Sequence, residues 1–175
     1  MENGKTVVIS ACPPRSGSTL LYNAICGLIN PTMKIKISSH PDRIVSDIKH
    51  LDVIKSHNMD FNSWDSILKN NDIDAYYISV ERRELNLHIK STLPNRTLLL
   101  QYEDLIVRND YTLNNVVDKL YEKCIQLLPS NISLCKETCV KRINDMNRMV
   151  EKMKNETFTK WDKFFGIHGK HRNRV

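Results

Sequence analysis

Two hydrophobic periodicities alternate along the first two-thirds of the chain. Short runs rich in Val, Ile, Leu and Tyr, typical of strands, lie between segments in which apolar residues recur with the period of an amphipathic helix. The strand pattern covers residues 5–11, 33–38, 51–56, 74–80 and 96–102. The helical pattern covers residues 18–28, 41–49, 62–69 and 83–93. This order predicts an α/β fold with a central, mainly parallel sheet of about five strands flanked by helices.

The last third of the chain has a different pattern. Residues 113–128 and 133–154 carry helical periodicity without a strand signal. Residues 157–175 are aromatic and basic and contain glycine, which favours irregular structure. Because no repeat, low-complexity linker or shift in composition divides the chain, we expect residues 1–175 to form a single domain with a helical C-terminal third.

The composition is that of a globular protein with a hydrophobic core. Of the 175 residues, 41% are hydrophobic and 26% are charged. No apolar run approaches the ~20 residues that a membrane-spanning helix needs. The first expected strand follows the N-terminus without a signal-peptide pattern. We therefore expect a cytoplasmic protein without a membrane span.

The cysteines lack the paired spacing of a metal site. The chain contains five of them, Cys12, Cys26, Cys124, Cys135 and Cys139. An odd count without a Cys-x-x-Cys pair favours reduced, mostly buried thiols, so we expect no bound metal. The formal net charge of +6 favours anionic ligands such as nucleotides, sulfated glycans or nucleic acids. We expect no specific nucleic-acid partner.

The loop between the first expected strand and the first expected helix is the strongest candidate for a binding site. Residues 12–19 read Cys-Pro-Pro-Arg-Ser-Gly-Ser-Thr. A tight loop at this place directs backbone N–H groups, hydroxyls and a cation to one point, where a phosphate-like anion can bind. The loop departs from the Walker P-loop, because Cys12 stands where the first glycine belongs and Ser18 where the lysine belongs. The cation, Arg15, lies inside the loop instead.

Polar residues also follow the later strands of the expected sheet. Lys55 lies at the end of the strand of residues 51–56 and His57 just past it, and strand alternation puts both side chains on the same side, toward the first loop. Arg83 and Ser91, eight positions apart, follow the strand of residues 74–80. A guanidinium with a hydroxyl suits a phosphate monoester. Residues 102–105, after the next strand, read Tyr-Glu-Asp-Leu.

These four motifs, in this order within residues 5–108, resemble those of the sulfotransferases that use 3′-phosphoadenosine-5′-phosphosulfate (PAPS). The resemblance implies a P-loop-like sulfotransferase fold and metal-free transfer of a sulfuryl group from PAPS to a hydroxyl or an amine. It implies that His57 is the general base, and that Lys55 and Arg15 stabilise charge on the sulfuryl group and the leaving phosphate. It further implies that PAPS is bound by Arg15, Ser16, Gly17, Ser18, Thr19, Arg83, Ser91, Lys170 and Arg172. The Tyr-Glu-Asp-Leu motif has a structural role in the family.

The chain departs from the family in three places. Leu20 stands where many cytosolic members have a tryptophan that stacks on adenine. Residues 84–85 are Glu-Leu, where the family has Asp/Asn-Pro after the arginine. The late Arg-Lys-Gly string of the family is absent, and Lys170 and Arg172 are its candidate replacements.

Two other functions remain open at this point. The first is a small-molecule kinase of P-loop type, which the missing Walker lysine disfavours. The second is a non-catalytic module that binds nucleotides or polyanions, for which the basic tail is the best support. For a sulfotransferase, the basic balance favours an anionic acceptor such as a glycan, while a sterol, a phenol or a peptide stays open.

Overall fold

The structure of the chain is a computed structural model that describes residues 4–13, 17–81, 93–106, 110–153 and 161–168. The main strands are β1 (Lys5–Ala11), β2 (Asp52–Ser56), β3 (Ile73–Glu81) and β4 (Thr97–Gln101). The helices are α1 (Ser18–Ile29), α2 (Phe61–Lys69), α3 (Asp110–Leu127) and α4 (Lys136–Met153). Two short strands, β5 (Trp161–Asp162) and β6 (Ile167–His168), follow α4. None of the helices in the described ranges is long and apolar enough to cross a membrane.

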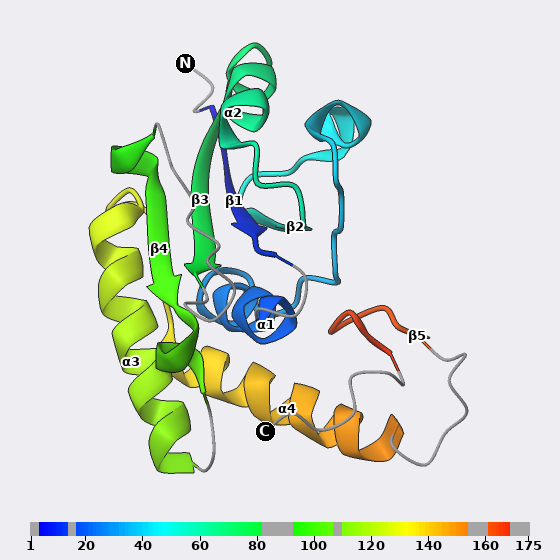
Figure 1. Cartoon of the computed structure of the whole chain (residues 1–175), viewed down its shortest axis with the longest axis vertical. Helices are drawn as coiled ribbons and strands as arrows, with labels where there is room; N and C mark the ends of the chain where they lie inside the picture. Colours follow the sequence, from blue (N-terminus) through cyan, green and yellow to red (C-terminus); the bar gives the residue numbers. More distant parts are fainter. Residues whose placement is uncertain (1–3, 14–16, 82–92, 107–109, 154–160, 169–175) are drawn as a thin grey trace.

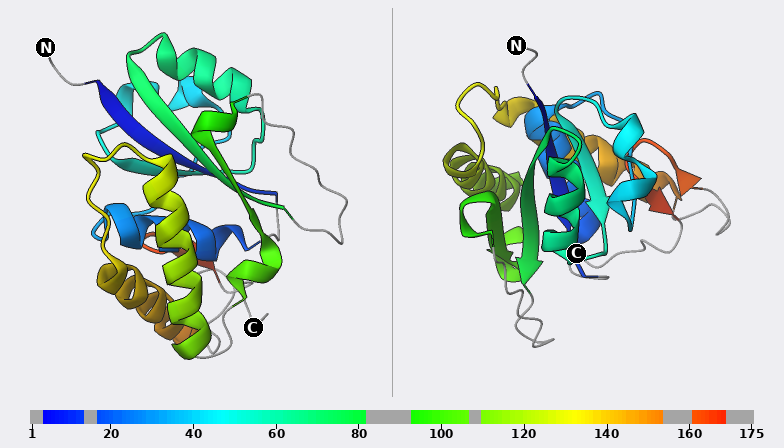
Figure 2. Two further views of the ribbon diagram at one scale, coloured as in Figure 1. Left: turned by 90° about the vertical axis from the view of Figure 1, so that its left-hand side faces the viewer. Right: turned by 90° about the horizontal axis from the view of Figure 1, so that it is seen from above.

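The main sheet has four parallel strands in the order β2-β1-β3-β4 (Figure 1). Helices α1 and α3 pack on one face of the sheet, and α4 packs against these two helices on the side away from the sheet (Figure 2). Helix α2 packs on the other face with the turns η1 (Pro41–Arg43) and η2 (Val45–Asp47). Because both faces are covered, the inner strands are apolar at successive positions. In β1, Val8 packs on the side of α1, while Val7 and Ile9 pack on the side of α2.

Helix α4 lies across α1 at a very short distance. A Cβ atom at Gly27 of α1 would come within 2.6 Å of the Cα of Cys139 in α4. The glycine therefore permits a backbone approach that any larger residue would prevent. This contact fixes α4 beneath the helix that follows the first loop.

The expected α/β class, with a parallel sheet flanked by helices and two helices late in the chain, is confirmed. The strand expected at residues 33–38 is not part of the main sheet, which has four strands in the described ranges instead of about five. This segment makes one bridge, between Ile37 and Lys55, and leaves the edge of β2 after it. Ser38 causes the departure, because its hydroxyl closes a turn with the backbone of His40.

Two further segments differ from the pattern. Residues 41–49, expected to be helical, form the two short turns η1 and η2, because Ile44 between them has φ −128° and ψ −6°, outside the helical region. Residues 161–168, expected to be irregular, form an antiparallel hairpin. Asp162 Oδ1 accepts hydrogen bonds from the N–H groups of Phe164 and Phe165 and so closes its turn. The helix expected at residues 83–93 lies mostly outside the described residues.

Candidate functional site

The carboxyl ends of β1 and β2 meet the first turn of α1. Parallel pairing places Ser10 of β1 opposite Lys55 of β2, and the N–H of Cys12 donates to the carbonyl of Ser56 at 3.0 Å. In open α/β sheets this edge is where ligands bind. The register therefore brings the Lys-Ser-His motif beside residues 17–19 of the first loop.

Lys55 of β2 is a buried cation whose side chain reaches the start of α1. Its residue is only 5% exposed, and its Nζ donates a hydrogen bond to Thr19 Oγ1 at 2.7 Å. Desolvation lowers the pKa of Lys55 to about 8, against a smaller raising effect of Cys12. No carboxylate of the described ranges forms an ion pair with it. A buried charge without a counter-charge is unfavourable, so this position is suited to an anionic ligand.

The first turn of α1 adds the polarity that an anion requires. No side chain of the described residues caps this end of the helix, and its N-cap residue is Gly17. The first N–H groups of a helix lack intrahelical acceptors and carry the positive end of the helix dipole. Gly17 has φ 77°, and a Cβ atom there would lie 3.3 Å from Cε2 of Tyr102. A side chain at Gly17 would therefore be strained and would press against the ring of Tyr102.

His57 is exposed just after β2, and one of its ring nitrogens bonds the backbone that follows β1. Its Nδ1 lies 2.8 Å from the carbonyl oxygen of Cys12. A carbonyl can only accept, so Nδ1 carries the proton and the neutral ring keeps a lone pair on Nε2. The described residues provide no partner for Nε2. The imidazole is thus oriented and in the tautomer that a general base requires.

Two buried hydroxyls, Ser10 Oγ and Ser79 Oγ, lie near this edge. In the described part of the chain neither has a hydrogen-bonding nitrogen or oxygen partner, and the thiol of Cys12 is their polar neighbour. Burial raises the pKa of this thiol to about 11, so Cys12 stays neutral at pH 7. Sequence reasoning missed Ser10, although a single serine in the apolar run Val-Val-Ile-Ser-Ala was a usable signal.

The structure describes five of the expected site residues, of which Lys55 bonds Thr19 in the first turn of α1 and His57 bonds the backbone after β1. The five are Gly17, Ser18, Thr19, Lys55 and His57. The other expected site residues lie outside the described residues, namely Arg15, Ser16, Arg83, Ser91, Lys170 and Arg172. The Tyr-Glu-Asp-Leu motif forms a short turn, Tyr102–Leu105, directly after β4. Within the described ranges, no group of His, Cys, Asp or Glu side chains could hold a metal ion.

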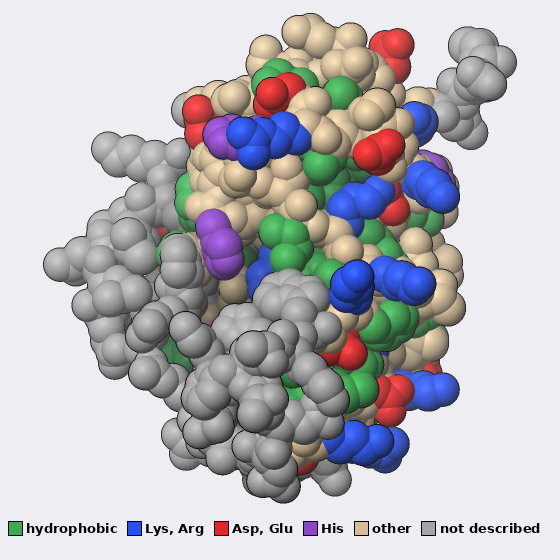
Figure 3. Space-filling view, turned by 90° about the vertical axis from the view of Figure 1, so that its right-hand side faces the viewer, with side chains coloured by type: hydrophobic (Ala, Val, Ile, Leu, Met, Phe, Trp, Pro, Cys, Tyr) green, Lys and Arg blue, Asp and Glu red, His purple; other side chains and the backbone are tan. Residues whose placement is uncertain are grey.

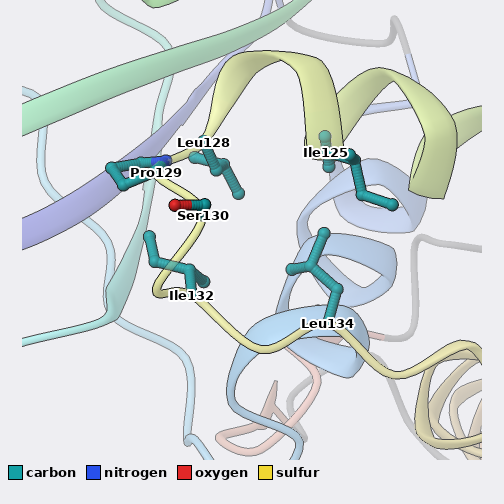
Figure 4. Close-up of a pocket in the computed structure, with 7 residues that line it drawn as sticks. Ile125, Leu128, Pro129, Ser130, Ile132 and Leu134 are labelled. Carbon is teal, nitrogen blue, oxygen red and sulfur yellow. The ribbon is translucent and has the colours of Figure 1, made fainter.

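A cavity of about 190 Å³ lies elsewhere, at the junction of α3 and α4. Figure 4 shows its lining of apolar side chains, among them Ile125, Leu128, Ile132 and Leu134. It contains no charged side chain and none of the expected site residues. An anionic nucleotide would find no counter-charge among these lining residues. The site around Lys55 and Thr19, at the carboxyl ends of β1 and β2, is therefore the better candidate.

Comparison with known proteins assigns no family to the chain. A scan against protein-family models and a search of the curated proteins both found no match.

Figure 3 shows one face of the molecule, on which Lys and Arg side chains are interspersed with acidic and apolar ones. The described part of this face lacks the continuous basic surface that favours polyanion binding. The proposed function therefore depends on the geometry of the site at the carboxyl ends of β1 and β2.

Proposed function

We propose that this chain is a PAPS-dependent sulfotransferase that transfers a sulfuryl group to a hydroxyl or an amine of an acceptor. The observation that carries the proposal is the buried Lys55, bonded to Thr19 at the start of α1 without a described carboxylate partner. Such a cation is suited to an anion at the end of the helix. The exposed His57 beside it has the properties of a general base, which an anion-binding module without catalysis would not need.

The described residues fit the phosphosulfate end of PAPS. Lys55 provides a positive charge, Thr19 a hydroxyl and the first turn of α1 its N–H groups, which together match a group of anionic oxygens. Ser10 adds a buried hydroxyl at the same edge. When bound, PAPS would supply a sulfuryl group whose bond to the phosphate oxygen breaks as the bond to the acceptor forms.

Each residue of the site then has a stated task. His57 Nε2 takes the proton of the acceptor hydroxyl or amine, while the carbonyl of Cys12 holds the ring through Nδ1. Lys55 compensates the negative charge that grows on the leaving phosphate. Arg15 and Ser16 are expected to add to this cradle, because they belong to the same loop. These fixed donors supply the charge compensation that Mg²⁺ gives in phosphoryl transfer.

The remaining donor contacts follow from the resemblance alone. Arg83 and Ser91 are expected to bind the 3′-phosphate, with Lys170 and Arg172 closing over it. The acceptor is a small molecule or a glycan, and the basic balance of the chain favours an anionic one.

Ligand-induced stabilisation tests the proposal directly. A specific ligand raises the melting temperature by mass action. We expect 3′-phosphoadenosine-5′-phosphate, the product nucleotide, to stabilise the protein more than 5′-AMP or ATP with Mg²⁺ does. A transfer screen with ³⁵S-labelled PAPS across phenols, sterols, peptides and glycans then identifies the acceptor. Stabilisation by ATP with Mg²⁺ would favour the kinase instead, and stabilisation by heparin alone would favour a polyanion-binding module.

A further inference from the structure

A buried arginine joins three segments that lie far apart in the sequence. Arg142 of α4 is only 3% exposed. Its Nε donates to Asn23 Oδ1 at 3.1 Å, its Nη1 to the carbonyl of Pro31 at 2.6 Å, and its Nη2 to the carbonyl of Phe164 at 3.2 Å. The guanidinium lies 4.5 Å from the centre of the Phe164 ring. In the described ranges only neutral acceptors and aromatic rings surround its charge. The hydrogen bonds of Arg142 therefore act mainly by orienting the segments that they join.

Asn23 extends this connection to the first turn of α1. The residue is fully buried, and its Nδ2 donates to the carbonyl of Thr19 at 2.9 Å and to the carbonyl of Phe165 at 2.8 Å. Arg142 determines the orientation of this amide, because its Nε donates only to Oδ1. Thr19 is also the residue whose hydroxyl accepts the bond from Lys55. The side chain of Asn23 therefore connects the hairpin of residues 161–168 to Thr19, the hydrogen-bond partner of Lys55.

Apolar packing holds the same hairpin against α1 and α4. Phe165 and Ile167 form a cluster with Met146 and Met153 of α4. Leu20, next to Thr19 in the first turn of α1, packs against this cluster. The hairpin thus contacts the first turn of α1 both through hydrogen bonds and through apolar side chains.

The hairpin also touches the segment that covers the backbone of Lys55. Its Gly166 has φ 68°, and a Cβ atom there would lie 1.8 Å from Cδ1 of Ile35. The N–H of Ile35 donates to the carbonyl of Lys163 at 3.2 Å. The next residue, Lys36, accepts the N–H of Lys55 at 2.8 Å. Lys55 is therefore held by two elements that the hairpin itself contacts.

We propose that Arg142 and Asn23 are positioning residues that lock the hairpin of residues 161–168 onto α1 and so set the place of Thr19 and Lys55. Loss of this lock would loosen the first turn of α1 and admit water to the lysine. The inference rests on the anion site of the proposed function, although the lock is independent of which anion binds there.

The ionisation of Lys55 in the ligand-free protein reports on the lock. It can be followed by NMR of ¹³C-labelled lysine, with Lys55→Met for assignment, at a temperature where circular dichroism shows each variant folded. Among the described groups Cys12 acts on Lys55 electrostatically, and its pKa of about 11 keeps it neutral over most of the titration. We expect Arg142→Met to raise the pKa of Lys55 by about one unit, because water returns to the ammonium group.

Matched variants separate positioning from general destabilisation. Arg148→Met removes an exposed arginine of the same helix and should leave the titration of Lys55 unchanged. Arg142→Lys keeps the charge without the guanidinium fork, and an intermediate shift is expected. Asn23→Leu should act like Arg142→Met, and the double variant should shift the pKa no further than the larger single change, since both act through one connection.

An unchanged Lys55 titration in folded Arg142→Met, or an equal shift in Arg148→Met, would overturn the proposal. If Arg142→Met does not fold, Asn23→Leu and Arg142→Lys give the same decision. Binding of 3′-phosphoadenosine-5′-phosphate is measured separately on the wild type. Its failure would refute the sulfotransferase while the Lys55 titration still decides whether the lock exists.

Discussion

Replacing Lys55 by methionine should stabilise the protein and abolish its activity. The pKa of Lys55 is lowered from 10.5 to about 8 by burial. At pH 7 this difference corresponds to about 3 kcal/mol by which the charged lysine destabilises the fold. The lost hydrogen bond to Thr19 offsets about 1 kcal/mol of the gain, and the flexible methionine fits the apolar space. A net gain of about 2 kcal/mol in the free energy of unfolding is expected.

The pH dependence of this gain follows from the direction of the shift. Between pH 8 and pH 10.5 the unfolded chain holds a proton on Lys55 that the folded protein has released. The stability of the wild type should therefore rise with pH across this window, relative to Lys55→Met. By pH 10 the destabilising effect of the lysine should fall below about 1 kcal/mol.

Urea denaturation at pH 7 and pH 10, in buffers without phosphate or sulfate, measures both effects. The fluorescence of the fully buried Trp64 reports unfolding, and the same data show whether the slope with urea is unchanged. Lys141→Met, at an exposed position of α4, is the matched control and should change stability by less than about 0.5 kcal/mol. A Lys55→Met variant that is less stable than the wild type at pH 7 would refute the reasoning, because Lys55 would then have a stabilising partner.

Three further predictions concern the same site. His57→Ala should abolish sulfuryl transfer yet leave the Kd for 3′-phosphoadenosine-5′-phosphate within about twofold, since the ring takes a proton and is not part of the anion cradle; an equal loss of binding in calorimetry would make His57 a binding residue. The affinity for the same nucleotide should fall about tenfold between pH 7 and pH 9 as Lys55 loses its proton, and Lys55→Met should remove this dependence; a flat profile in the wild type speaks against Lys55 as a ligand. Gly17→Ala should destabilise the protein by about 1 kcal/mol or more, because of the positive φ and the contact with Tyr102, and should weaken nucleotide binding; thermal denaturation and calorimetry of this variant with unchanged values would contradict that account.

Local periodicity predicted the regular elements well where it was strong. The expected strand at residues 5–11 coincides with β1, and the expected helix at residues 18–28 differs from α1 by one residue. β1 is buried at six successive positions and α1 at ten of its twelve, so the strongly apolar pattern and the packing agree. The strand at residues 33–38 failed, because pairing with β2 depends on a neighbour that the local pattern does not contain.

Part of the candidate site could also be predicted from the sequence. The order of strands and loops was enough to predict that the Lys-Ser-His motif and residues 17–19 lie at one edge, since parallel strands end together. Ser10 was not recognised, although a lone serine in an apolar run was a signal, because its full burial beside Cys12 became known only from the structure.

By itself, the sequence determined the α/β order, the loop before α1 and the chemical types at the strand ends. The tertiary structure alone decided their chemical states. The pKa of Lys55 depends on burial, the tautomer of His57 on the carbonyl of Cys12, and the docking of the hairpin on Arg142, which bonds Asn23 across 119 positions of the chain. These properties arise from contacts between distant segments and from exclusion of water, and neither is encoded in a local pattern of residues.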